Sequence, residues 1–246
     1  MKRLLSLALV LGCVTFVSAC GKKTANTPAP AGGTSSSVTT LESFETIEAK
    51  AKAGDANAQF ELGAMYHDGQ GVEKSFPKAK EWFEKSAKQN DPRAQFNLGV
   101  MYYTGESVKQ DYKKAQEWFE KAAVQGNTRA QFNLGVMFYR GEGVKQNFET
   151  AINYFTKSGS LGFAEAQFNL GVMLAKGEGS EIDVAQAYAW FEAARSFGNQ
   201  NAAGVITQIE SELKPAEIKQ LKALAEDLKK EINARVAAAV AAGKAF

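Results

Sequence analysis

A six-residue motif recurs four times along this chain at an interval of 36 residues, and this period limits the possible folds more than any other feature. Its copies read Ala-Gln-Phe-Glu/Asn-Leu-Gly and begin at Ala58, Ala94, Ala130 and Ala166. Methionines, glycines and aromatic residues recur in the same register, namely Met65, Met101, Met137 and Met173, then Gly69, Gly105, Gly141 and Gly177, then Phe83, Phe119, Phe155 and Phe191. The pattern predicts an array of structural repeats.

Each repeat is predicted to form two helices. In the first repeat the apolar residues at helical spacing are Ala58, Leu62, Met65 and Tyr66, followed by Ala79, Trp82 and Phe83. The sequence 68–71 breaks the helix with two glycines, and Pro77 suits the first turn of the second helix. We expect Gly63 and Ala79 to lie where the helices approach closely. One hairpin cannot bury both faces, so consecutive repeats must stack.

The two ends of the array are expected to carry caps. Residues 41–57 are predicted to form an N-terminal capping helix, residues 58–201 four 36-residue repeats, and residues 202–246 a half-repeat and a C-terminal capping helix. Pro215 is expected to begin that last helix, and the alanine-rich tail 237–246 to fray. Ser107 replaces the second loop glycine in the second repeat, and Ser180 and Val184 depart from the pattern in the fourth, whose loop is expected to differ in shape.

The first 19 residues have the pattern of a secretory signal peptide. Lys2 and Arg3 precede a short apolar run over residues 4–17, and small residues follow it. The run is shorter than the roughly 20 apolar residues that a transmembrane helix needs. Residues 20–40 are rich in Gly, Ser, Thr, Pro and Ala, so they are expected to form a disordered tether.

The sequence Val17-Ser18-Ala19-Cys20-Gly21 resembles the lipobox of bacterial lipoproteins. The resemblance implies cleavage before Cys20 and three acyl chains, palmitate among them, on that cysteine, which would anchor the chain stably. Gly21 stands where an aspartate retains many such proteins at the inner membrane, which favours an outer-membrane anchor facing the periplasm. An ordinary signal peptide with a chance cysteine is the alternative.

The repeats resemble the Sel-one-like repeat (SLR) family, a relative of the tetratricopeptide repeat. The motifs Gly71-Val72, Gly143-Val144, Lys78-Ala79 and Lys114-Ala115 match its pattern, as do the Leu-Gly and Trp/Tyr-Phe pairs. The resemblance covers about residues 56–240. It implies an all-α fold, a right-handed α-solenoid of stacked helix-turn-helix repeats with capping helices.

The composition leaves little for catalysis or metal binding. The chain has one histidine and two cysteines, and Lys2 and Arg3 account for its net charge of +2. His67 is interpreted as an exposed helix-end residue because no nucleophile has a fixed spacing to it. The glycine loops lack the Lys-Ser/Thr of a phosphate-binding loop. The chain is therefore predicted to be no enzyme and to need no cofactor or metal.

The remaining candidate site is a groove. In tetratricopeptide-like solenoids the first helices line the concave surface, and this register places there Phe60, Phe96, Phe132, Phe168, Asn97, Asn133, Asn169, Arg93, Arg129, Tyr103 and Tyr139. Amides can bond to a peptide backbone and aromatic rings supply contact area. The arginines favour an acidic partner segment. Packing between repeats is an equally open role for the phenylalanines.

These observations predict a membrane-anchored periplasmic scaffold that binds an envelope protein or peptide through the concave face of the solenoid. No nucleic-acid or small-molecule ligand is expected. Two alternatives stay open. One is a cell-wall or β-lactam-binding or -hydrolysing enzyme, although the chain lacks the cysteine pairs of the SLR proteins linked to that activity. The other is a surface-exposed host-interaction protein.

Overall fold

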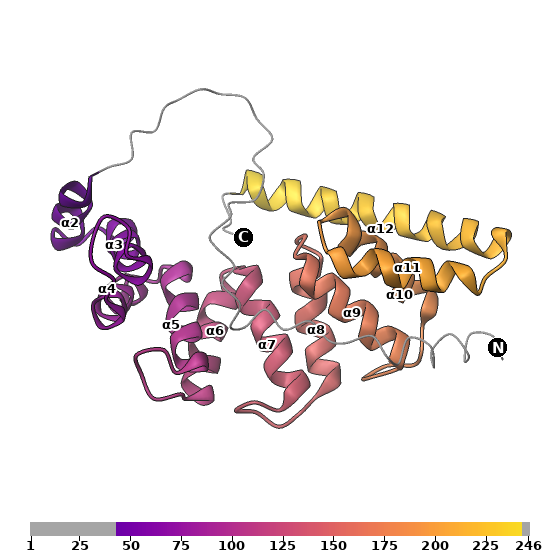
Figure 1. Ribbon diagram of the computed structural model, residues 1–246, viewed down its shortest axis with the longest axis horizontal. Coiled ribbons are helices and arrows are strands. Elements are labelled where there is room, and N and C mark those ends of the chain that lie inside the picture. Colours follow the sequence, from indigo (N-terminus) through magenta and orange to yellow (C-terminus); the bar gives the residue numbers. More distant parts are fainter. Residues whose placement is uncertain (1–42, 243–246) are drawn as a thin grey trace. The chain divides into compact units, whose positions relative to one another are not determined.

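The computed structural model describes residues 43–242, and every regular element in this range is an α-helix (Figure 1). The helices are α2 (Phe44–Lys52), α3 (Ala56–Asp68), α4 (Phe76–Lys88), α5 (Pro92–Thr104), α6 (Tyr112–Val124), α7 (Thr128–Arg140), α8 (Phe148–Gly159), α9 (Ala164–Lys176), α10 (Val184–Ser196), α11 (Gln200–Ser211) and α12 (Pro215–Ala241). The predicted fold of stacked helix pairs is confirmed. The predicted signal peptide, Cys20 and the tether lie outside the described residues.

The described chain divides into two compact units, residues 43–118 and residues 119–242, with the boundary inside α6. In the first unit α3 packs on α2 and α4, and α4 packs on α5. In the second unit α8 packs on α7 and α9, and α10 packs on α9, α11 and α12. Within each unit these contacts join helices that are neighbours in sequence, apart from α10 and α12, as a stacked repeat array requires.

The turn between the two helices of a repeat has the same backbone form in all four repeats. Each first helix ends at a glycine with positive φ, and a second left-handed residue follows two positions later, namely Gly71, Ser107, Gly143 and Gly179. The amide of Ser75 donates to the carbonyl of Tyr66 at 2.8 Å, and in the fourth repeat Asp183 donates to Leu174 at 3.0 Å. The expectation that the fourth loop differs was wrong for its backbone, because its substitutions leave both left-handed glycines in place.

A glycine–phenylalanine contact sets the close approach of the two helices in a repeat. A Cβ atom on Gly63 would lie 2.7 Å from the ring of Phe83, and one on Gly135 would lie 2.6 Å from the ring of Phe155. Ala79 is fully buried at the same crossing. This confirms the predicted role of the small residues, since only a missing side chain leaves room for the ring.

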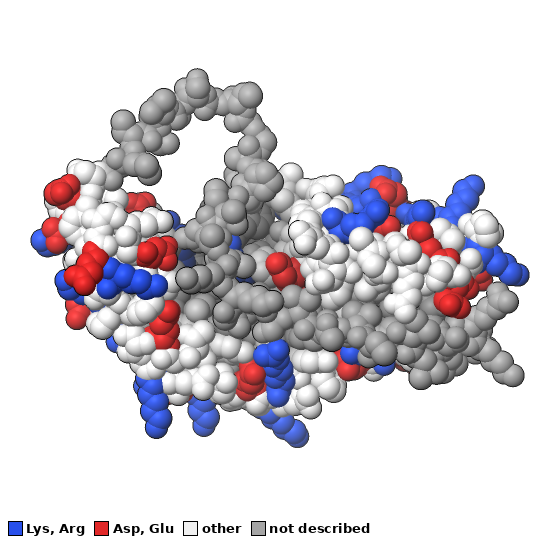
Figure 2. Space-filling model, in the orientation of Figure 1, with Lys and Arg blue, Asp and Glu red and all other residues white. Residues whose placement is uncertain are grey.

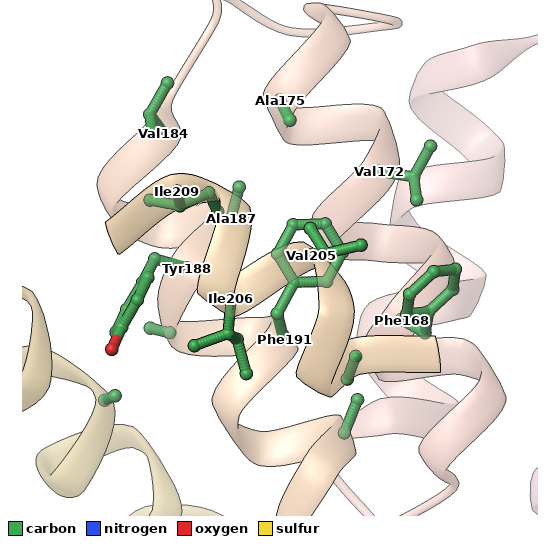
Figure 3. Close-up of a cluster of buried hydrophobic side chains, with 14 residues drawn as sticks. Phe168, Val172, Ala175, Val184, Ala187, Tyr188, Phe191, Val205, Ile206 and Ile209 are labelled. Carbon is green, nitrogen blue, oxygen red and sulfur yellow. The ribbon is translucent and has the colours of Figure 1, made fainter. Parts of the chain in front are cut away.

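The repeats bury continuous apolar clusters. In the first unit Ile47 and Ala51 of α2 extend the core of α3 and α4, which includes Leu62 and Phe83. The larger cluster lies in the second unit, where α9, α10 and α11 meet (Figure 3). The rings of Phe168 and Phe191 contact each other in it at a tilt of 56°, with centroids 5.4 Å apart. Each repeat thus completes its core with residues of the next.

Helix α12 begins at Pro215, as its sequence predicts, and packs on α10 through Ala225. It continues to Ala241, so residues 237–241 of the tail that we expected to fray are helical, because a run of alanines sustains a helix without a wide apolar stripe. Within residues 43–242, no helix combines the length and apolar character needed to cross a membrane.

Candidate functional site

The residues of the predicted groove lie on the first helices of the repeats, α3, α5, α7 and α9. Asp55, Asp91 and Asn127 cap three of these helices by accepting the amide hydrogen of the residue three positions later. Because the caps begin the helices at equivalent positions, each predicted column recurs at one place per repeat.

The phenylalanine column packs against the second helices. The ring of Phe60 lies 5.9 Å from Phe83, and that of Phe132 lies 5.6 Å from Phe155 and 5.1 Å from Phe163. Phe132 and Phe168 are each 1% exposed, whereas Phe60 and Phe96 are half-buried. In the third and fourth repeats these rings therefore belong to the core, and any groove role of the column falls to the first two.

The tyrosines at the ends of the first helices pack against the starts of the second helices. Tyr103 lies 5.3 Å from Tyr112, and Tyr139 lies 5.4 Å from Phe148, measured between ring centroids. His67 and Phe76 form the equivalent pair at 5.3 Å. In the fourth repeat both positions lose their rings together and become Ala175 and Val184. The two positions therefore form one packing contact of the repeat.

The same column also ties one repeat to the next. His67 Nε2 lies 3.1 Å from a carboxylate oxygen of Glu106 in the following loop. Tyr139 forms the equivalent hydrogen bond to Glu178. Burial, the charge of Glu178 and this bond together raise the pKa of Tyr139 to about 12, and Arg140 opposes the shift. Glu106 and Glu178, the glutamates of the Gly-Glu loops, thus accept hydrogen bonds from the preceding repeat. We did not single them out from the sequence.

Arg93 makes contacts across the repeat boundary. Its Nη2 atom donates to Asp91 at 2.5 Å and to Asn57 of the preceding repeat at 2.8 Å. Its guanidinium lies 4.2 Å from the ring centroid of Phe60. The charge and the flat face of this predicted groove residue are both engaged within the protein, so Arg93 stabilises the stacking of the first two repeats.

The asparagine column and Arg129 differ from Arg93. Asn97 is half-buried, Asn133 is 4% exposed and Asn169 is fully buried. The Oδ1 atom of Asn133 has no hydrogen-bond donor in the described part of the chain. Arg129 is half-buried and forms no ion pair with a described residue. Both groups lie on α7, within the predicted groove, and have bonding capacity that the described repeats do not use.

The motif glutamines, to which we assigned no role from the sequence, join consecutive repeats. The glutamine of each six-residue motif is buried. In three repeats its amide donates to the end of the preceding helix: Gln59 to Ala51 at 3.1 Å, Gln131 to Ala123 at 3.1 Å and Gln167 to Gly159 at 2.9 Å. In the second repeat Gln95 donates to the Oδ1 atom of Asn90 at 2.9 Å. This role could have been predicted from the sequence, because the glutamine recurs at a core position of every repeat and a buried amide needs a hydrogen-bond partner.

Buried serines make a second such link, within the repeat. The hydroxyl of Ser86 donates to the carbonyl of Ala56, and that of Ser158 to Thr128, both at 2.8 Å. Each bond joins the second helix to a carbonyl in the first turn of the first helix. The serines therefore fix the relative height of the two helices.

Among the described residues the least exposed ionisable group is Tyr188 of α10, where the fourth repeat meets the C-terminal cap. The Tyr188 hydroxyl donates to Glu210 at 2.7 Å and lies 3.3 Å from Glu192, and it points away from the apolar cluster (Figure 3). Burial and these carboxylates raise the pKa of Tyr188. Arg195 and Lys222 pair with the two glutamates, so the network is neutralised and joins α10, α11 and α12.

The exposed surface of α12 carries both signs of charge (Figure 2). Ion pairs along the helix join Glu226 to Lys229, Asp227 to Lys230 and Glu231 to Arg235. Such mixed pairs are typical of a solvated helix face. No group of three or more His, Cys, Asp or Glu side chains suited to a metal ion occurs among residues 43–242.

Comparison with protein families gives four consecutive matches to the Sel1 repeat, at residues 56–91, 92–127, 128–163 and 164–196. Together they cover more than half of the chain. The matched segments begin where α3, α5, α7 and α9 begin, so each contains one helix pair. No protein of curated function matches the sequence.

Two solved structures resemble the chain over most of its length. One is c5321, a protective antigen present in uropathogenic Escherichia coli strains that displays an SLR fold, with a TM-score of 0.69 and 30% identity over 82% of this chain and 45% of that one. The other is a Sel1 repeat protein from Oxalobacter formigenes, with a TM-score of 0.62 and 35% identity over 68% of this chain and 48% of that one. The chain spans about half the length of each.

Proposed function

Because the chain belongs to the Sel1 repeat family, whose members typically act as protein-interaction scaffolds, we propose that it is a lipid-anchored scaffold of the bacterial envelope that binds a partner protein on its first helices. The proposal includes the outer-membrane anchor on Cys20, a periplasmic orientation and the absence of enzymatic activity.

The observation that carries the binding role is the unused bonding capacity on α7. The described repeats satisfy Arg93, the amide N–H donors of Gln59, Gln131 and Gln167, and the hydroxyls of Ser86 and Ser158 internally. Within the predicted groove, Arg129 forms no ion pair with a described residue, and the Oδ1 atom of Asn133 has no hydrogen-bond donor among them. Polar groups that a fold leaves uncompensated are candidates for contact with a ligand.

The anchor rests on the sequence around Cys20. A positive start, a short apolar run and a small residue before the cysteine support lipidation, and the polar stretch 21–40 supports a tether between the lipid and the repeats. Labelling of cells with a palmitate analogue tests it. We expect label on the natural chain and none on Cys20→Ala, which should leave the membrane fraction.

Partner capture tests the binding role. The natural chain and an Asn97→Ala/Arg129→Ala/Asn133→Ala variant are used as baits on solubilised envelope proteins, with mass spectrometry as the readout. The control bait, Glu81→Ala/Lys113→Ala/Glu149→Ala, changes three exposed residues of second helices. We expect the first variant alone to lose a partner. Equal recovery by all three baits would exclude the first helices as the binding face.

A surface-exposed orientation is the second candidate, because the E. coli protein with an SLR fold is a protective antigen. Protease treatment of intact cells separates the two orientations. A periplasmic scaffold is expected to be cleaved only after the outer membrane is permeabilised.

A further inference from the structure

His67 is the only histidine of the chain, and both of its ring nitrogens lie against carboxylate oxygens. Its Nδ1 atom is 2.7 Å from Asp68, the last residue of α3, and its Nε2 atom is 3.1 Å from Glu106, in the loop that joins α5 and α6. The contact with Asp68 lies within one helix, whereas the contact with Glu106 joins the first repeat to the second. The protonation state of one ring therefore decides how many of these hydrogen bonds can form.

An ionised carboxylate can only accept hydrogen bonds, so each of these two contacts needs a hydrogen atom on the imidazole nitrogen. A neutral imidazole has one N–H group. It donates to one carboxylate and directs the lone pair of its other nitrogen towards the second. The imidazolium has two N–H groups and donates to both, and such bonds between ions are stronger than those between neutral groups. The arrangement around His67 thus fits the protonated ring.

The other neighbours of His67 do not reverse this preference. The ring of Phe76, at the start of α4, packs edge-on at 5.3 Å between centroids and is uncharged. Lys74, in the loop before α4, is exposed and lies over the Phe76 ring at 4.3 Å. Two carboxylates in direct contact outweigh an ammonium placed over the neighbouring ring, because the Coulomb energy falls with distance and solvent screens an exposed charge.

Tyrosine occupies the position of His67 in the second and third repeats, as Tyr103 and Tyr139. Tyr139 bonds to Glu178, and its pKa of about 12 keeps this donor protonated throughout the range in which a histidine changes charge, about pH 5 to 8. A histidine at the same position therefore replaces a permanent link between repeats with one that responds to pH in this range.

We propose that His67 is a pH-sensitive clasp between the first and second repeats. Towards about pH 5 the imidazolium donates to Asp68 and Glu106 together and holds the loop of the second repeat, residues 105–111, against the end of α3. Above about pH 8 the neutral ring donates to only one carboxylate, so this loop opens more often. Acid thus strengthens the junction of the first two repeats, and this inference does not depend on the proposed scaffold function.

Amide hydrogen exchange on the full-length chain tests the clasp. The amide of Asp111 donates to the carbonyl of Tyr102 at 2.9 Å and closes the loop, so its protection reports loop opening. The matched variant, His67→Tyr, supplies the hydroxyl that the third repeat uses and does not titrate below about pH 8. Dividing the protection in the natural chain by that in this variant at the same pH removes the pH dependence of exchange itself. We expect this ratio to rise about two- to fivefold from about pH 8 to about pH 5.5, the effect of one exposed ion pair.

Two further variants separate the clasp from other effects of charge. Glu106→Gln offers a side-chain amide that can pair with either form of the ring, so its ratio to His67→Tyr should stay constant with pH. Glu73→Gln is the control. It removes the charge of an exposed loop residue that does not bond to the His67 ring, and it should keep the rise. A ratio for the natural chain that does not change with pH, a rise that persists in Glu106→Gln, or its loss in Glu73→Gln would overturn the inference.

Discussion

His67 reaches across a repeat boundary to Glu106, 39 residues further along the chain, with 3.1 Å between Nε2 and the carboxylate oxygen. Its Nδ1 atom lies 2.7 Å from Asp68, so both ring nitrogens face carboxylates. Tyr139 and Glu178 form the equivalent pair in the second unit. A donor at the end of one first helix thus holds the loop of the next repeat, and the donor can be a histidine or a tyrosine.

The Tyr139–Glu178 pair predicts a loss of stability at high pH. The pKa of Tyr139 is raised in the folded state to about 12, above its unfolded value of about 10, so its contribution is complete below pH 10 and falls as pH rises towards 12. Urea unfolding between pH 9 and 11.5 measures this decline in the free energy of unfolding. Tyr139→Phe, which lacks the ionisable hydroxyl, is expected to show a shallower decline, and an unchanged slope would contradict the assignment.

The contact between Gly135 and Phe155 predicts that one added methyl group destabilises the third repeat. Gly135→Ala should lower the free energy of unfolding by about 1–3 kcal/mol, because its Cβ would lie 2.6 Å from the ring. Gly204→Ala is the control within α11, where a Cβ meets nothing within 4 Å. It should raise stability by about 1 kcal/mol through helix propensity alone. Denaturant unfolding that gives both variants the same sign would refute the contact.

Ser107 predicts a stabilising substitution. It holds φ at 64°, a left-handed conformation that costs a residue with a side chain about 1–2 kcal/mol. Ser107→Gly should therefore stabilise the first unit by about 1 kcal/mol. The reverse change, Gly71→Ser, should cost a similar amount, since a Cβ there meets only Met65 at 3.5 Å. Thermal melts of both variants test the pair, which must move in opposite directions.

The glutamine links predict a third pair of variants. Gln89 donates to the Oε1 atom of Gln59 at 2.9 Å, whereas the equivalent Oε1 of Gln131 has no donor because Leu161 stands where a glutamine would be. Gln89→Leu should cost about 1–3 kcal/mol by leaving a buried acceptor unpaired. Leu161→Gln should recover part of such a cost in the third repeat. A stabilising Gln89→Leu would show that these bonds contribute nothing to the stacking.

The C-terminal network predicts sensitivity to acid. The hydrogen bond from Tyr188, and then that from Lys222, lower the pKa of Glu210 in the folded state. Its contribution is therefore present above the unfolded pKa of about 4.3 and is lost as pH falls below it. Tyr188→Phe removes the main cause of the shift, so its stability should decline less steeply from pH 5 to pH 3, as measured by urea unfolding.

The sequence was sufficient for the helix pairs and their stacking, because the period and the glycine positions encode them directly. Gly63 illustrates this, since its position at the close approach of the two helices was predicted, and the structure adds its contact with Phe83. The fourth loop shows the opposite case. Its substituted residues suggested a different shape, whereas the left-handed glycines Gly177 and Gly179 determine the turn whatever lies between them and the next helix.

The candidate site was only partly predictable. Arg93 and Arg129 are equivalent in the repeat register, and both were assigned to the groove. They differ because of a neighbour two positions earlier, Asp91 in one repeat and Asn127 in the other, which decides whether the guanidinium is paired. Hydrogen-bond pairing depends on three-dimensional contacts, so an alignment of repeats predicts the position of a side chain better than its partners.

The links between repeats join residues at constant offsets along the chain. In three repeats the motif glutamine reaches back eight residues, and His67 and Tyr139 each reach forward 39 residues. Gain or loss of a whole 36-residue segment by recombination therefore regenerates both kinds of link at the new junction, whereas an insertion of any other length breaks them. The gene can thus change the length of the protein in steps of one repeat, and copies already present can diverge in charge without any redesign of the contacts that hold them together.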